Sequence, residues 1–113
     1  MDEDKVVLCA SSKYEEKYYL NPAFDKLPDA IKDELKAMCV LFTEDIGGIL
    51  SLEYDEDGHL HFVTIADEDD ILYDEIGCAL KIKQYQNTKR ELMESLELFY
   101  KVFILGEDIP LEN

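Results

Sequence analysis

The alternation of apolar and polar residues predicts a β-hairpin at the start of the chain. Residues 6–10 form a short apolar run, and residues 17–20 are rich in aromatic side chains. A polar stretch separates the two runs, and Asn21-Pro22 follows the second. Short runs of β-branched and aromatic residues bounded by turn signals are typical of strands. The pattern therefore predicts two antiparallel strands that end at Asn21.

Residues 50–54 and 60–64 predict a second hairpin, because both runs alternate apolar and polar positions. The turn Asp55–Gly58 joins them, and its Asp-Gly pair supplies the positive φ that tight hairpin turns need. A few apolar residues fall on the opposite face, so that face is not wholly polar: Ile49, Val63 and Ile65.

An amphipathic helix is predicted between Pro28 and the pair Gly47-Gly48. Proline suits the first helical position because its missing N–H has no partner there, and glycine accepts the left-handed conformation that ends many helices. The apolar residues of this segment recur three and four apart, which places them in one stripe: Ile31, Leu35, Met38, Cys39 and Phe42.

The C-terminal third shows helical periodicity that is interrupted in the middle. The apolar positions at helical spacing are Leu72, Ile76, Ala79 and Leu80, followed by Leu92, Leu96, Phe99 and Phe103. Residues 83–91 are polar except for Tyr85, and Thr88 with Glu91 fits a capping box. The pattern predicts either two helices with a joint near Asn87 or one long helix whose middle leaves the sheet.

The predicted elements define an α+β fold. Their order is ββαββα, with the last helix long or split near Asn87. This order favours an antiparallel sheet of about four strands with helices packed on one face. A chain of 113 residues fits a single domain, 1–113. We expect residues 1–4 and 107–113 to be flexible tails.

Charged residues are sorted along the chain. Between Lys36 and Lys81 there is no lysine or arginine, whereas residues 44–75 hold 12 acids. Residues 76–90 reverse the pattern, with no acid and four bases: Lys81, Lys83, Lys89 and Arg90. The net charge of −16 repels nucleic acid and anionic lipid, so we expect no direct nucleic-acid binding and no membrane binding. With 47% hydrophobic residues the chain is nevertheless foldable.

The cysteines and the N-terminal sequence indicate a cytoplasmic protein. Cys9, Cys39 and Cys78 are odd in number and widely spaced, which suits neither a disulfide framework nor a zinc site. No apolar run approaches 18 residues, and the acidic start of the chain is unlike a signal peptide. We expect all three cysteines to be reduced and mostly buried.

Two candidate metal sites have incomplete sets of ligands. Residues 53–58 resemble the start of an EF-hand loop, but Thr64 stands where calcium needs a bidentate glutamate. His59 and His61 lie two apart on a strand and would need a third ligand such as Glu53. A hairpin turn and the polar side of a strand explain these residues without a metal.

Catalytic arrangements are similarly incomplete. The acids 67–70 with Asp74 and Glu75 could hold magnesium beside a phosphate substrate, but a solvated face explains them as well. The helical acids Glu91, Glu94 and Glu97 lack a facing acidic pair, and the cysteines have no activating base nearby in the sequence. We expect no catalytic residue, no metal site and no cofactor.

Two groups of residues are candidates for contact with a partner. The first combines the acidic loop with the basic cluster: Asp67, Glu68, Asp69, Asp70, Lys81, Lys83, Lys89 and Arg90. The bases could hold an anionic ligand or the acidic loop of a second copy. Alternatively they are neutralised within the chain, for example through Arg90 and Glu94, which are four residues apart.

The second group lies on the last helix, where only Lys101 is polar between residues 98 and 105. Leu98, Val102 and Leu105 form a second apolar stripe that one sheet cannot cover together with the first. A two-fold homodimer would bury this stripe against its own copy. The alternative is that the first helix or the tail 109–111 covers it within one chain.

Three segments carry a resemblance to a known family: KVVLCASSKYEEKYYLN, DELKAMCVLFTEDIGGILSLEYDEDG and LYDEIG. They are similar to a family of short, acidic, uncharacterised proteins from anaerobic Firmicutes. The resemblance implies a bacterial cytosolic protein of no known activity.

Taken together, these features favour a non-enzymatic protein-binding or adaptor module that forms a homodimer. Two alternatives stay open. One is an enzyme that uses the acidic cluster and a divalent metal. The other is a nucleic-acid mimic that presents carboxylates in place of phosphates to a basic partner.

Overall fold

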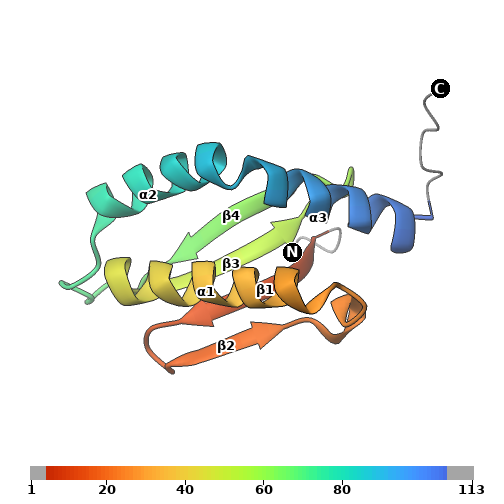
Figure 1. Cartoon of the computed structure of the whole chain (residues 1–113). Helices are drawn as coiled ribbons and strands as arrows, with labels where there is room; N and C mark the ends of the chain where they lie inside the picture. The colour runs from red at the N-terminus through yellow and green to blue at the C-terminus, as the bar shows by residue number, and fades with distance from the viewer. Residues whose placement is uncertain (1–4, 107–113) are drawn as a thin grey trace.

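A four-stranded antiparallel sheet carries all the helices on one of its faces (Figure 1). The computed structural model describes residues 5–106, so the predicted tails 1–4 and 107–113 lie outside the described residues. The elements are β1 (Val6–Ser12), β2 (Lys17–Leu20), the 3₁₀ turn η1 (Pro22–Phe24), α1 (Asp29–Ile46), β3 (Ile49–Tyr54), β4 (Leu60–Ile65), α2 (Glu75–Thr88) and α3 (Arg90–Phe103). The predicted α+β class is confirmed.

The strand order is β2-β1-β3-β4, and each neighbouring pair is antiparallel. Both predicted hairpins are confirmed, and α1 carries the chain across the sheet so that β3 pairs with β1. In the second hairpin Leu52 lies opposite Phe62 and Tyr54 opposite Leu60. The opposite face of the sheet has no helix on it within residues 5–106, and Ile65 is exposed there.

A β-bulge in β1 turns two consecutive residues toward the helices. The register with β3 shifts between Val7 and Cys9, so Leu8 is the extra residue of the strand. Leu8 and Cys9 are both fully buried, which strict alternation of a strand would not allow. The bulge brings the Cys9 Sγ to 3.8 Å from the Cys39 Sγ of α1. It therefore adds a core residue that the alternation pattern does not predict.

Helix α1 follows its predicted stripe closely. Leu35, Met38, Cys39 and Phe42 are buried, and Ile31 is half-buried against the same core. Pro28 is the N-cap rather than the first helical residue, so the helix begins one position later than predicted. At the other end the Gly47 N–H donates to the Thr43 carbonyl, and Gly47 has a φ of 92°. Glycine ends the helix as expected.

The C-terminal region forms two helices rather than one, which confirms a split. The break lies at Lys89, two residues after the predicted joint, and the two helices follow one another over the β4 side of the sheet (Figure 1). The predicted capping box is wrong, because Lys89 holds the N-cap position of α3 without a side-chain capping bond. The 3.6-residue period cannot locate a break of this kind, since both helices continue in nearly the same direction.

Helix α3 buries Leu92, Leu96 and Tyr100. The Tyr100 ring stacks on Tyr54 of β3 at 4.0 Å between ring centroids, and the Tyr54 hydroxyl donates to the Leu96 carbonyl at 2.8 Å. The prediction that Phe103 packs on the sheet is wrong: its side chain is 65% exposed. The reason is that α3 runs past the end of the strands, where Phe103 stacks on Phe99.

Candidate functional site

Helix α2 and the segment just before it present large apolar side chains to solvent. The apolar positions at helical spacing, Leu72, Ile76 and Leu80, are exposed and do not pack on the core. The exposed fractions are 94% for Ile71, 86% for Leu72, 77% for Ile76 and 64% for Leu80. Exposed apolar residues scattered singly are ordinary, whereas here four of them lie within ten residues of the chain.

A second, more polar stripe of α2 faces the protein. Cys78 is buried, and Ile82 and Tyr85 are half-buried against the core. The Tyr85 ring lies 6.1 Å from that of Phe42 on α1 and 6.3 Å from that of Phe62 on β4. Because these residues sit at four- and three-residue spacing on the opposite side of the helix, packing them turns Ile76 and Leu80 outward.

Two of the predicted partner-binding bases hold α2 against α1. The Lys81 ammonium lies 2.7 Å from the Asp45 carboxylate, and the Lys89 ammonium lies 3.1 Å from that of Glu34. The carboxylates are largely solvent-exposed, so each pair contributes little free energy. Their consequence is geometric, since one pair ties the middle of α2 to α1 and the other ties the joint between α2 and α3 to α1. Neutralisation within the chain is thus confirmed for Lys81 and Lys89.

The other two bases of the predicted cluster remain without an acidic partner. Within residues 5–106, neither Lys83 nor Arg90 lies in an ion pair, and the expected pair between Arg90 and Glu94 is not formed. Both bases are exposed. They flank a shallow hollow of about 450 Å³ at the joint between α2 and α3, which is lined by Leu80, Lys83, Gln84, Gln86, Asn87 and Arg90.

The acidic loop before α2 is held in place by contacts with three other segments. The Tyr14 hydroxyl of the β1–β2 turn donates to the Asp70 carboxylate and accepts from the Asp67 N–H at 3.0 Å. The Asp74 N–H donates to the Ile46 carbonyl at 3.1 Å, and its carboxylate caps α2 by accepting from the Gly77 N–H at 2.8 Å. The side chains of Asp67, Glu68 and Asp69 are left exposed.

We call the exposed residues of this region the α2 surface: Ile71, Leu72, Ile76, Leu80, Lys83 and Arg90. Of these, Leu80, Lys83 and Arg90 line the same hollow. Along the chain, the exposed acids of the loop come first, then four exposed apolar residues, then two bases without ion pairs. The structure thus places two bases of the predicted cluster, Lys83 and Arg90, beside the exposed side chain of Leu80. The sorting of acids and bases along the chain was the one feature of the sequence that pointed to this region as a candidate contact surface.

The residues predicted to form a dimer interface near the end of the chain differ in solvent exposure. Leu98 and Leu105 are exposed, whereas Val102 is half-buried. Leu98 and Val102 lie in the second half of α3 and Leu105 lies just after its end, so all three are separate from α2.

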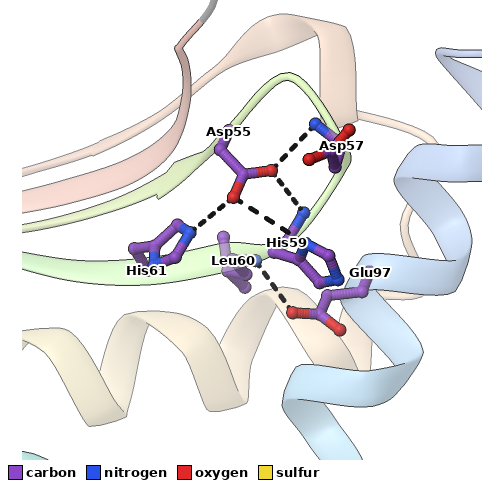
Figure 2. A network of polar contacts seen from close by, with 6 residues as sticks. All are labelled: Asp55, Asp57, His59, Leu60, His61 and Glu97. Atoms are coloured by element: carbon purple, nitrogen blue, oxygen red, sulfur yellow. Dashed lines mark hydrogen bonds and ion pairs between the residues drawn. The ribbon is translucent and has the colours of Figure 1, made fainter.

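The turn between β3 and β4 carries a separate network of polar contacts (Figure 2). One oxygen of the Asp55 carboxylate accepts from the N–H groups of Asp57 and His59, at 2.9 and 3.0 Å. The other lies 2.7 Å from His61 Nε2. The bond to His61, then the one from the His59 N–H, lower the pKa of Asp55 to about 2. From α3, the Glu97 carboxylate accepts from the Leu60 N–H at 2.8 Å.

Asp55, Asp57 and His59 are also the residues of this turn that could hold a metal. One ligand atom from each lies within 4.8 Å of the others. This set combines two residues of the candidate segment 53–58 with His59 of the other candidate set, whose Glu53 lies opposite His61 in the strand register. Both oxygens of Asp55 already accept hydrogen bonds within the turn. We therefore interpret the network as the closure of a hairpin.

A hollow of about 320 Å³ between α1 and the first hairpin was not predicted from the sequence. Its lining includes Lys17 and Tyr18 of β2 and Lys36 and Thr43 of α1. No motif marks it, because it arises where two elements that are distant in the sequence meet.

The cysteines are free and buried, as predicted. The thiol of Cys39 shares a hydrogen bond with Cys9, and this bond together with burial raises the pKa of Cys39. A thiol in this setting stays protonated and is a poor nucleophile.

The fold and the exposed α2 surface define a small α+β protein with a preformed apolar face and no assigned chemistry. The chain belongs to a family of unknown function (DUF6145), whose model matches residues 5–108. The predicted membership of an uncharacterised family is thereby confirmed. No curated protein and no solved structure is similar to this chain at a significant level. Within residues 5–106, no helix is both long and apolar enough to span a bilayer.

Proposed function

We propose that this protein is a non-enzymatic, cytoplasmic protein-binding module whose contact site is the α2 surface. The observation that carries the proposal is the row of four exposed apolar side chains beside Lys83 and Arg90, which have no ion pair in the described part of the chain. Contiguous apolar patches on a soluble domain mark interaction sites. The resemblance to short acidic bacterial proteins supports the cytoplasmic setting.

The α2 surface is also held in position before any partner arrives. Tyr14, Asp74 and Lys81 fix the loop and the inner side of the helix by hydrogen bonds and an ion pair. A surface that is already ordered loses less conformational entropy on binding than a flexible one. This rigidity favours a docking face over a loop that merely tolerates apolar residues.

The α3 stripe of Leu98, Val102 and Leu105 is a second candidate for the contact surface. Leu98 is 48% exposed, which supports it. Val102 in the middle of the stripe is half-buried, however, so the stripe offers less apolar area to a partner than the α2 surface does. A variant of Val102 therefore serves as a comparison in the experiments below.

The two alternative functions draw less support from the geometry. Within residues 5–106, the carboxylates of the acidic loop do not gather with a third ligand atom into a group that could hold a metal. A nucleic-acid mimic would use the exposed acids Asp67, Glu68 and Asp69. The exposed apolar residues that follow them in the chain do not resemble a phosphate backbone, so mimicry does not explain them.

The proposal is tested by co-purification of the tagged full-length chain from a native extract. We expect Leu80→Glu to abolish retention of the bound protein. Leu41→Glu is the matched control, because Leu41 on α1 is 62% exposed, close to the 64% of Leu80. Thermal unfolding of both variants checks that they are folded. Equal retention by wild type, Leu80→Glu and Leu41→Glu would show that the α2 surface is not the contact site.

A further inference from the structure

We infer that the α2 surface binds the α2 surface of a second copy of this chain, as an antiparallel pair of helices related by a two-fold axis. The inference rests on the proposed function and names the partner. Its basis is the order of charges along the loop before α2, the exposed side of α2 and the start of α3. Acids precede the apolar patch, bases follow it, and the two ends complement each other.

The two charged ends of α2 are too far apart to neutralise each other within one chain. Glu75 and Lys83 are eight residues apart, so they are separated by about 12 Å along the helix axis. Arg90 lies farther still, beyond the joint with α3. The two ends therefore need a partner that carries both kinds of charge at the matching spacing.

A second copy in the antiparallel orientation places a base beside the acids, and an acid beside the bases, at both ends of the helix. If the two-fold axis passes near Ala79 and Leu80, Glu75 of each copy lies beside Lys83 of the other. Arg90 of each copy then lies beside the loop acids Asp69 and Asp70 of the other. A two-fold interface repeats every contact twice, so one arrangement accounts for both unpaired bases. A parallel pair would instead place acids against acids.

The apolar part of the surface fits the same arrangement. Ile76, Leu80, Lys83 and Asn87 share one side of α2 at the spacing of helical turns. In the antiparallel pair, Leu72 of one copy faces the shallow hollow at the α2–α3 joint of the other, next to Asn87. The exposed apolar side chains of both copies would then be buried in the same interface.

The contact is of modest size, which sets the expected strength. One helix face with its preceding loop buries less than the roughly 800 Å² per partner of a standard interface. We therefore expect a reversible dimer that forms at micromolar concentrations. The net charge of −16 on each copy also opposes association. The matched local charges therefore determine the relative orientation of the two copies more than the affinity.

The first test is sedimentation of the full chain between about 1 and about 200 μM, where a reversible dimer changes its population. Wild type should approach twice 13.1 kDa at the upper end. Leu80→Glu should stay monomeric, whereas Leu41→Glu and Val102→Glu should still form the dimer. A monomeric Val102→Glu beside a dimeric Leu80→Glu would overturn the inference in favour of α3.

The second test uses charge reversal and distinguishes an antiparallel pair from any other. Lys83→Glu alone should weaken the dimer at least about tenfold, because it places like charges opposite each other, and so should Glu75→Lys alone. A one-to-one mixture of the two variants restores both pairs, and it should sediment as a heterodimer near the wild-type affinity. A mixture that associates no better than the separate variants would contradict the antiparallel arrangement.

The failure of this inference is distinguishable from the failure of the proposed function. Wild type that stays a 13.1 kDa monomer at the highest concentration overturns the dimer. The proposed function would still stand if Leu80→Glu, but not Leu41→Glu, loses a protein retained from the native extract.

Discussion

At the residue scale, Asp55 shows how one carboxylate closes a hairpin. One oxygen accepts from two backbone N–H groups of the turn that joins β3 and β4, and the other contacts the imidazole of His61 on β4 (Figure 2). These contacts favour the charged carboxylate, so the pKa of Asp55 falls to about 2 in the folded protein. The usual value of an aspartate is about 3.9.

The sign of the pH dependence follows from that difference. Because the pKa of Asp55 is lower in the folded state, its contribution to stability is present above about pH 4 and is lost as the pH falls through about 2. We predict that Asp55→Asn lowers the denaturant midpoint at neutral pH and that its gap to wild type closes in acid. Urea unfolding at several pH values measures this. Glu56→Gln is the control, since Glu56 makes none of these contacts.

A direct titration gives a second readout for the same residue. Carbon-detected NMR should place the pKa of the Asp55 carboxyl near 2, and His61→Phe should raise it because the largest cause of the shift is removed. An unshifted Asp55 pKa in wild type would show that the turn does not hold its carboxylate as described.

At the element scale, α2 is oriented by Tyr85 and Ile82, which pack on the core, and not by Ile76 and Leu80. Ile76 and Leu80 are the more hydrophobic side chains, yet they point to solvent. Tyr85 lies between Phe42 and Phe62 and joins α2 to both α1 and the sheet. An aromatic ring buries a large area and gains further from contact with neighbouring rings, which offsets the exposure of two aliphatic residues.

This orientation predicts different effects for two substitutions on the same helix. Tyr85→Ala should lower the free energy of unfolding by about 2 kcal/mol, roughly half the loss from truncating a fully buried aromatic residue. Leu80→Ala should change it by less than about 0.5 kcal/mol, as is usual for exposed sites. Urea unfolding of the monomer at low protein concentration compares them. A larger loss for Leu80→Ala than for Tyr85→Ala would mean that the helix faces the other way.

At the scale of the whole molecule, the net charge of −16 is the dominant electrostatic feature. The ion pairs of the described residues are largely exposed, such as Lys13 with Glu44 at 2.7 Å, so they contribute little free energy. Repulsion among the excess acids therefore outweighs the attraction within these pairs, and it destabilises the compact state.

Salt should accordingly stabilise the folded chain. The Debye length falls to about 10 Å at 0.1 M salt, which screens repulsion between distant carboxylates. We predict that the midpoint of thermal unfolding rises between roughly 20 mM and roughly 300 mM sodium chloride. The Leu80→Glu variant provides the measurement without self-association. A midpoint that falls with added salt would show that the surface ion pairs outweigh the repulsion.

The sequence by itself determined the elements of this protein and the sorting of its charges. Both hairpins and α1 follow from local signals, because alternation, Asp57-Gly58 and Gly47-Gly48 act within a few residues. The fold class follows in turn, since two hairpins and amphipathic helices have few ways to bury their apolar faces. The acids of residues 44–75 and the bases of residues 76–90 are also readable directly.

Only the tertiary structure decided which side of α2 packs, and with it the candidate site. The helix carries two possible inner stripes, and hydrophobicity alone favours the wrong one. Contacts with residues distant in the sequence set the choice: Ile46 holds the start of the helix, Asp45 pairs with Lys81, and Phe42 meets Tyr85. Local periodicity contains no information about such contacts, because they exist only after α1 and the sheet have come together. The same reason hides the bulge at Leu8, the break at Lys89 and the exposure of Phe103.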